Sequence, residues 1–230
     1  MSQFSYPYPR PAVSVDSIIL TWSDRQLRLL LIQRGRDPFK EHWALPGGFV
    51  DADEDIDVAA ARELAEETSL HDIKLDQWRA YGTPQRDPRT HVITVVYFGM
   101  FAWNSQNASA GDDAKAVRWY PLKQLPTLAF DHAEIIQSFL MNLRIKIRCQ
   151  PIGYELLPQE FRLAELQRIY EAILNLTLDA DLFEKQVTSM GHLRSLSNHP
   201  GYWAFDRDHY LRLTKRGFGL DLEACQAKVS

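Results

Sequence analysis

Three glutamates in the N-terminal half of the chain, Glu63, Glu66 and Glu67, are the residues best suited to chemistry. Residues three and four positions apart are neighbours on a helix, so a helix over this segment would gather the three carboxylates on one side. Like charges at that spacing repel, whereas a hard divalent cation with oxygen ligands turns the repulsion into attraction. The spacing therefore indicates a site for Mg²⁺ or Mn²⁺, with a solvated acidic helix face as the alternative.

A pair of glycines stands upstream of the glutamates. Gly47 and Gly48 lack side chains, so the backbone there could approach phosphate oxygens closely. Gly48 is followed by five residues, Glu54, seven residues and then the run Arg62-Glu63-Leu64-Ala65-Glu66-Glu67. This arrangement within segment 43–70 resembles the Nudix box of the Nudix hydrolases, in which a strand, a glycine loop and a glutamate-bearing helix hold the diphosphate of a nucleotide derivative.

The resemblance implies an α/β/α sandwich that acts on nucleoside diphosphates linked to another group. It also implies that the three glutamates carry the metal, that Arg62 orients a glutamate, and that Glu66 and Glu67 are catalytic if a metal-bound water attacks phosphorus. Ser69 departs from the family pattern, because it stands where the signature has glycine and would be strained by about 1 to 2 kcal/mol in left-handed geometry. No pattern identifies a base for the water, so turnover stays open.

A second group of polar residues follows the box. Arg86 and Arg89 precede a long apolar segment, and the planar fork of arginine pairs well with phosphate, so both could clamp a diphosphate or a terminal ribose. His91 and His132 are further ligand-contact candidates. The alternatives are a charged loop for residues 86–91 and a helix start at 130–132 in which Asp131 is the N-cap. Trp43 and Tyr97 are interpreted as core residues.

The elements that would position these residues are mixed α and β. Alternating and β-branched apolar segments predict strands, and one amphipathic segment predicts a helix. Pro, Asp, Asn, Ser and Gly clusters separate them. The expected strands are 14–22 and 27–34, joined as a hairpin, then 77–84, 91–103 and 116–122, and the expected helix is 131–148.

The pattern changes at Gln150 and Pro151, because proline disfavours helix in the residue before it. We therefore expect two domains, 1–150 and 151–230. The second contains predicted helices at 161–174 and 181–190, the latter with a capping box from Asp181 to Glu184 and with Gly191 after its end. The segments HLRSL and YWAFDRDHYLRL, flanking the turn 197–201, predict a hairpin. This order is that of a winged helix-turn-helix.

Charge is divided unevenly in the second domain. The whole chain has a formal net charge of −4, which excludes binding of nucleic acid by bulk charge. Residues 185–216, however, hold six basic residues (Lys185, Arg194, Arg207, Arg212, Lys215 and Arg216) against two acidic ones. In a helix-turn-helix the second helix enters the major groove. The candidates for DNA contacts are Lys185, Gln186 and Ser189 on that helix, and Arg194, His199 and Arg207 on the hairpin.

Taken together, the two halves resemble the Nudix-related transcriptional regulators of NAD metabolism in bacteria. The segment YELLPQEFRLAELQRIYEAIL is the more specific part of the resemblance. It implies a homodimer that binds a palindromic operator and responds to ADP-ribose or a related nucleotide, with hydrolysis weak or absent. Two departures are Arg162, where relatives tend to have a helix-capping hydroxyl, and the acidic Glu184 on the predicted recognition helix.

Other functions remain as alternatives to a regulator, which we expect to be a repressor. The intact glutamates would suit a Mg²⁺-dependent ADP-ribose pyrophosphatase whose C-terminal part packs on the Nudix core or forms a dimer interface. Regulation by a sugar or another nucleotide is a further possibility. Cys149 and Cys225 show no metal-binding or disulfide spacing and are expected to be free thiols. We expect a cytoplasmic protein, since neither a signal peptide nor a membrane span is evident.

Overall fold

The computed structural model describes residues 8–103 and 114–216. The chain divides into two compact units, Met1–Leu156 and Leu157–Ser230. The N-terminal unit ends later than the predicted boundary after residue 150, and it therefore also includes the 3₁₀ helix η2 (Tyr154–Leu156). Among the described residues, no helix is long and apolar enough to cross a membrane. Cys149 is a free, exposed thiol, and Cys225 lies outside the described residues.

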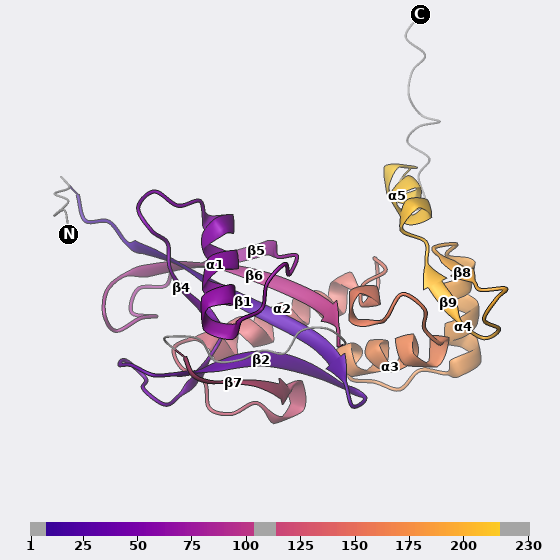
Figure 1. Ribbon diagram of the computed structural model, residues 1–230, viewed down its shortest axis with the longest axis horizontal. Helices are drawn as coiled ribbons and strands as arrows, with labels where there is room; N and C mark the ends of the chain where they lie inside the picture. Colours follow the sequence, from indigo (N-terminus) through magenta and orange to yellow (C-terminus); the bar gives the residue numbers. More distant parts are fainter. Residues whose placement is uncertain (1–7, 104–113, 217–230) are drawn as a thin grey trace, which may run out of the picture. The chain divides into compact units, whose positions relative to one another are not determined.

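A mixed seven-stranded sheet forms the centre of the N-terminal unit (Figure 1). Its main path runs β3-β2-β1-β6-β5, with β4 paired to β1 and β7 paired to β2. β1 and β6 are parallel along their full length, while the other pairs are antiparallel. The strands are β1 (Ala12–Ser23), β2 (Gln26–Arg34), β3 (Trp43–Ala44), β4 (Gly47–Phe49), β5 (Asp76–Tyr81), β6 (Val92–Ala102) and β7 (Ala114–Pro121). The predicted hairpin and the three later strands are all present.

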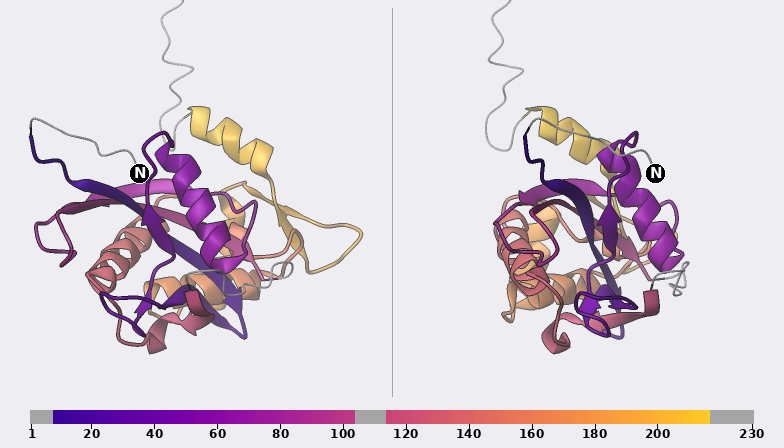
Figure 2. Two further views of the ribbon diagram at one scale, coloured as in Figure 1. Left: turned by 60° about the vertical axis from the view of Figure 1, so that its left-hand side comes forward. Right: turned by 90° about the vertical axis from the view of Figure 1, so that its left-hand side faces the viewer.

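Two helices cover opposite faces of this sheet, α1 (Ile56–Thr68) and α2 (His132–Lys146) (Figures 1 and 2). Successive side chains of a strand point to opposite faces, and two neighbours on β6 illustrate this. Tyr97 packs in a cluster with Ala59 and Ala60 of α1, whereas the ring of Phe98 lies 5.2 Å from that of Phe139 of α2. The fold is therefore the predicted α/β/α sandwich. A short 3₁₀ helix, η1 (Leu122–Gln124), follows β7.

The C-terminal unit has the predicted order of two helices and a hairpin, followed by a further helix. Its elements are α3 (Leu163–Leu174), α4 (Ala180–Ser189), β8 (Leu193–Ser195), β9 (Trp203–Phe205) and α5 (Arg207–Arg216). Phe161 forms an antiparallel bridge with Trp203, so this residue before α3 joins the two-stranded sheet. Leu166 and Ile169 of α3 and Val187 of α4 are buried. This arrangement is a winged helix, as predicted.

Three local predictions are wrong in detail, two in this unit and one at the start of α2. The N-cap of α4 is Asp179, whose carboxylate accepts from the Leu182 N–H, so the capping box from Asp181 to Glu184 does not form. The second hairpin strand ends at Phe205, because Asp206 caps α5 by accepting from the His209 N–H. Asp131 precedes α2 but makes no capping bond with its side chain, since its carboxylate binds Arg86 instead.

Candidate functional site

Helix α1 presents the predicted glutamates next to the two glycines. It begins after Asp55, which accepts from the Asp57 N–H at 2.9 Å, and it ends at Thr68. Ser69 then takes the left-handed conformation, with φ of 58°, where the family signature has glycine. The predicted glycine loop is instead the short strand β4, paired to β1 with Gly48 opposite Val15.

Both glycines of β4 lie where a side chain would not fit. A Cβ on Gly47 would stand 2.0 Å from the Val15 carbonyl oxygen, and one on Gly48 would stand 2.3 Å from the Glu63 carboxylate. The Gly47 N–H donates to Glu67 Oε2 at 2.9 Å. Because these residues have no side chains, the carboxylates of α1 can approach the backbone of β4. Glycine is therefore required here for lack of space, and not only for backbone freedom.

Arg62 joins the acidic groups of this region. Its guanidinium donates two hydrogen bonds of 2.7 Å to Glu54, and Nη1 donates to Glu63 at 2.9 Å and to Glu66 at 3.1 Å. Nη2 also donates to the Phe49 carbonyl oxygen. The pKa of Glu54 is lowered by its hydrogen bond to Arg62, which favours the charged carboxylate. Arg62 thus contacts two of the three predicted metal ligands rather than one glutamate.

Burial distinguishes the three glutamates. Burial raises the pKa of Glu63, and it raises that of Glu67 to about 8 despite the hydrogen bond from Gly47. The side chain of Glu66, by contrast, is 59% exposed. Desolvated carboxylates of this kind are stabilised in the charged form by a nearby cation, so the donor set suits a hard divalent ion.

Arg62 positions two of these carboxylates. Across residues 8–103 and 114–216, no group of three or more His, Cys, Asp or Glu side chains has a metal-binding arrangement. The Arg62 guanidinium contacts both Glu63 and Glu66, so it supplies the positive charge between them. Glu63, Glu66 and Glu67 are the residues that would hold Mg²⁺ or Mn²⁺, and the first two would do so after their bonds to Arg62 rearrange.

A pocket lies beside the glycines on the N-terminal unit. It contains about 420 Å³ of space not filled by protein, open solvent included. Three arginines and two phenylalanines contribute to its wall, which suits an anionic ligand with a planar ring. Its lining includes Asp16, Arg34, Gly47, Gly48, Phe49, Arg86, Asp87, Arg89, Phe130 and His132.

Arg86 and His132 form a buried polar network at this pocket. Arg86 makes a bidentate pair with Asp131, with bonds of 2.7 and 2.9 Å, and its side chain is 5% exposed. His132 Nδ1 accepts from the Leu45 N–H at 2.9 Å, and Nε2 lies 3.5 Å from Asp16 Oδ1. Burial lowers the pKa of His132, so the imidazole is held neutral.

Arg89 and Arg34 lie closer to the solvent side of the pocket. Arg89 is paired with Asp87 at 2.6 Å, and its guanidinium lies 5.0 Å from the ring centre of Phe49 and 5.8 Å from that of Phe130. Arg34 lies 4.8 Å from the Phe130 ring centre. Stacking on these aromatic side chains keeps both guanidinium groups at the pocket wall.

The structure brings five predicted ligand-contact residues together at the pocket and leaves two outside its lining. Gly47, Gly48, Arg86, Arg89 and His132 line the pocket. Arg62 does not line it and binds Glu54, Glu63 and Glu66, while His91 is exposed and lies 3.0 Å from the Gly82 carbonyl oxygen. Our sequence reasoning missed Asp16 and Arg34. Asp16 is the one charged residue of the predicted strand 14–22 and is buried, and a charge within that strand was the available signal.

Helix α4 presents the predicted DNA-contact residues on the other unit. Lys185, Gln186 and Ser189 are all exposed, and Val187 is buried on the opposite side of the helix. Thr188, next to Ser189, is half-buried and donates to the Glu184 carbonyl oxygen. Glu184 is exposed on the same helix. Within the described part of the chain, Lys185 has no ion-pair partner.

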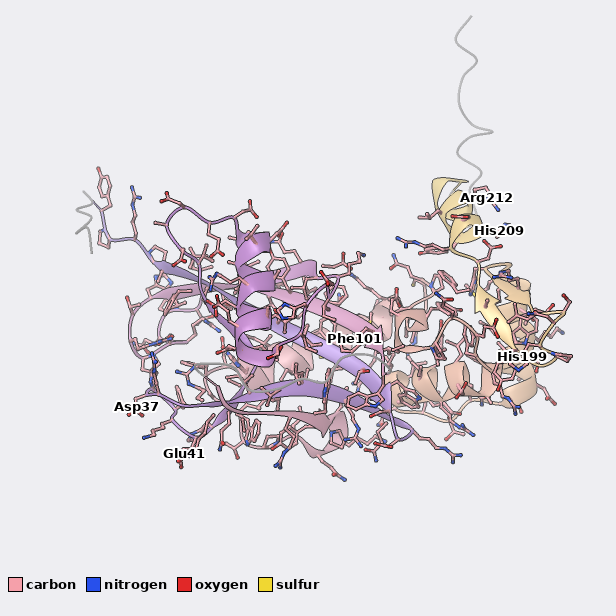
Figure 3. The ribbon with its side chains drawn as sticks, viewed as in Figure 1. Asp37, Glu41, Phe101, His199, His209 and Arg212 are labelled. Carbon is pink, nitrogen blue, oxygen red and sulfur yellow. The ribbon has the colours of Figure 1, made fainter. Side chains whose placement is uncertain are left out.

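The hairpin holds the remaining candidates in two different settings. Arg194 lies on β8 and is exposed, whereas His199 in the turn binds Glu160 at 3.0 Å and stacks on Tyr202, with ring centres 3.9 Å apart. Figure 3 shows His199 projecting from the hairpin turn, with His209 and Arg212 on α5. Arg207 was predicted on the hairpin but is the first residue of α5, because Asp206 starts a helix there. The side chains of Lys215 and Arg216 lie outside the described residues.

Comparison with known families accounts for both units. The NUDIX domain model matches residues 10–139, and the model of the NrtR DNA-binding winged helix domain matches residues 153–200. The chain belongs to the NUDIX family, whose hydrolases generally use a divalent metal. It is 36% identical over 188 residues to the ADPR responsive transcriptional repressor NtrR of Acinetobacter baylyi, covering 80% of this chain and 75% of the relative. The chain is thus an NrtR-like repressor, which confirms the resemblance stated from sequence.

Solved structures and one enzyme are also similar. Shewanella oneidensis NrtR superposes with a TM-score of 0.68 at 30% identity, covering 84% of this chain and 93% of that one, and its complex with a 27mer DNA gives 0.67. Its NUDIX domain bound to ADP ribose gives a TM-score of 0.55 at 33% identity, over 60% of this chain and 94% of that one. The ADP-ribose pyrophosphatase of Methanocaldococcus jannaschii is 42% identical over 133 residues, or 58% of this chain and 75% of the enzyme.

Proposed function

We propose that this protein represses genes of NAD metabolism by binding operator DNA through its winged helix, and that ADP-ribose or a related nucleotide in the NUDIX unit controls the binding. The observation that carries the proposal is the union in one chain of a NUDIX domain with an NrtR winged helix, similar over 80% of its length to an ADPR responsive repressor. The 27mer complex of the Shewanella protein supports the DNA part, and the ADP ribose complex supports the ligand part.

The pocket chemistry supports a nucleotide ligand. A diphosphate needs cations, while a nucleobase needs a flat apolar partner. Arg89 is 42% exposed and so meets an incoming anion, and Phe49 and Phe130 offer ring faces beside it. We assign ligand contacts to Gly47, Gly48, Arg86, Arg89 and His132 of the lining. Arg62 and His91 are retained as contacts only if the ligand extends beyond the lining residues.

The winged helix supports an operator with two half-sites. We assign phosphate or base contacts to Lys185, Gln186 and Ser189 of α4 and to Arg194 of β8, since all four are exposed. Arg207 and His199 would contact flanking phosphates from the start of α5 and from the hairpin turn. A homodimer with two-fold symmetry would place two such surfaces on a palindrome, and its half-sites would be about one helical turn apart or a multiple of it.

A direct test combines DNA binding with ligand titration. The full-length protein is titrated onto labelled duplexes from the upstream regions of NAD biosynthesis and salvage operons, at low salt, and ADP-ribose is then added. We expect one fragment to bind and to be released by ADP-ribose but not by ribose 5-phosphate. Absence of binding to every such fragment, or binding that ADP-ribose leaves unchanged, would contradict the proposal.

A second candidate function is hydrolysis of ADP-ribose, favoured by the retained glutamates and by the identity to the Methanocaldococcus enzyme. A bound divalent ion would supply a nucleophilic water and neutralise phosphate charge. In this chain, Glu63 and Glu67 would hold the ion against β4, and Arg62 would orient Glu63 and Glu66. Glu66 and Glu67 are the proposed catalytic pair if activity is present.

Product analysis separates the two functions. Incubation with ADP-ribose and Mg²⁺ would yield AMP and ribose 5-phosphate, and Glu66→Gln would abolish the products. Equal inertness of wild type and variant, in a preparation that still releases DNA with ADP-ribose, would leave a sensor without hydrolase activity.

A further inference from the structure

Leu182 is a large apolar side chain on the exposed side of α4. Its side chain is 63% exposed. It is the third residue of α4, a helix that buries Val187 on another side. A leucine of the hydrophobic core would be expected on the buried side. The domain therefore does not use this side chain for its own packing.

The neighbours of Leu182 on the helix surface are polar and, on one side, basic. Successive residues of an α-helix are rotated by about 100° around its axis. On this basis one arc of about 100° on the surface of α4 holds, in order, Lys185, Ser189, Leu182 and Gln186. Asp181 and Glu184 fall beyond Lys185, on the flank away from Leu182. The exposed face of α4 therefore combines a cation, a hydroxyl, an amide and one branched apolar group.

The major groove of DNA presents a matching set of groups. Each base pair offers hydrogen-bond donors and acceptors, and only thymine adds a methyl group, which apolar side chains contact. Another protein surface would also accept a leucine, but the adjacent Lys185 and the exposed Arg194 of β8 favour a polyanion over a neutral partner.

We propose that Leu182 reads the C5 methyl group of a thymine in the operator, and so sets sequence preference where Gln186 and Ser189 alone would not. This inference rests on the proposed DNA binding of the winged helix. Leu182 would then determine which base is preferred at one position of the operator. The reason is that a leucine side chain contacts the C5 methyl group, which thymine carries and the other bases lack.

The test removes the methyl group from the DNA and the side chain from the protein. Full-length protein first selects its site from a pool of random-sequence duplexes. Each thymine of the selected site is then replaced by deoxyuridine, which deletes only the methyl, and Kd values are measured for wild type, Leu182→Ala, Leu182→Met and Leu176→Ala. Leu176 is the matched control, since it is 42% exposed in the same unit but outside α4.

We expect at least one thymine whose replacement weakens wild-type binding about fourfold, the equivalent of about 0.8 kcal/mol for one buried carbon. Leu182→Ala should bind the two duplexes equally, whereas Leu182→Met and Leu176→Ala should retain the factor. A wild type indifferent to every replacement, or a Leu182→Ala that still distinguishes the duplexes, would overturn the inference while leaving DNA binding intact. Failure to select any duplex would instead overturn the proposed function.

Discussion

The cations of the two units are held in opposite ways. Around the NUDIX pocket, Arg62, Arg86 and Arg89 are each hydrogen-bonded to carboxylates of their own unit. On the winged helix, Lys185 and Arg194 are exposed and have no ion-pair partner within the described residues.

The difference follows from the size of the two ligands. A small anion offers few contacts, so the groups that meet it must be fixed beforehand to limit the entropy lost on binding. DNA offers a long row of phosphates and releases counterions from many of them, so solvated side chains suffice. The contrast predicts that charge removal costs stability in the first unit and DNA affinity in the second.

The largest effect is expected for Arg86→Ala. It would leave Asp131 and the buried Asp16 without their cation, and breaking a buried pair typically costs about 3 to 5 kcal/mol. We expect the free energy of unfolding of the N-terminal unit to fall by about 3 kcal/mol in urea titrations. Five of the six tryptophans belong to this unit, so fluorescence follows its transition.

The matched control is Lys115→Ala, which breaks the exposed pair with Glu41, whose side chains are 55% and 61% exposed. It should cost less than about 1 kcal/mol. Similar losses for both variants would remove the contrast between buried and exposed pairs.

A smaller effect, on DNA rather than on stability, is expected for Lys185→Ala and Arg194→Ala. Each should weaken operator binding about tenfold and reduce the slope of log K against log salt by about 0.9 for each phosphate that is no longer neutralised. Fluorescence anisotropy at several salt concentrations measures both quantities. Lys115→Ala removes one positive charge from the other unit and should change neither slope nor affinity. An unchanged salt slope in Lys185→Ala would show that this lysine does not meet phosphate.

A pH-dependent loss of stability is expected from His132. Burial lowers its pKa in the folded state below 6.5, so the neutral imidazole stabilises the fold fully above about pH 6.5 and this contribution is lost as pH falls further. The N-terminal unit should therefore lose stability through this residue as pH falls from about 7 to about 5.5. His132→Asn can still accept from Leu45 and should show a flatter dependence. If the free energy of unfolding of the variant and of the wild type falls equally with pH, His132 is not the group responsible.

The smallest effect concerns two helix ends. Ser69 and Asn175 both follow a helix in left-handed geometry, with φ of 58° and 55°. Asparagine tolerates this conformation better than serine. Ser69→Gly should therefore stabilise the N-terminal unit by about 0.5 kcal/mol after the entropy cost of glycine, whereas Asn175→Gly should gain nothing. Thermal unfolding of both variants tests the ranking, and an equal gain would contradict it.

The sequence predicted elements well and their ends less well. The strands and helices follow from apolar periodicity, which burial on one face enforces. Helices α2 and α4 start within one residue of the prediction, but their capping bonds were wrong. The Asp131 side chain binds an arginine 45 residues away, and Asp179 caps α4 in place of Asp181. Arg207 was misplaced because Asp206 acts as a helix cap, which an alternating segment does not reveal.

The site was predictable where its residues share one segment. Glu63, Glu66 and Glu67 are spaced along a single helix, so their convergence is a matter of period. Asp16 and Arg34 reach the pocket from β1 and β2, and Arg86 reaches Asp131 from a distant loop. Contacts between such distant segments depend on the order of the strands and on the path of the loops, which a single sequence does not reveal.

The position of Arg62 has a consequence for the affinity of this helix for cations. A cation that enters a cluster of like charges gains by relieving their repulsion. Here the acidic helix carries its own guanidinium counter-charge, bonded to Glu54, Glu63 and Glu66. An incoming divalent ion would therefore compete with Arg62 for the Glu63 and Glu66 carboxylates, and its net binding energy would be smaller by the cost of separating those ion pairs.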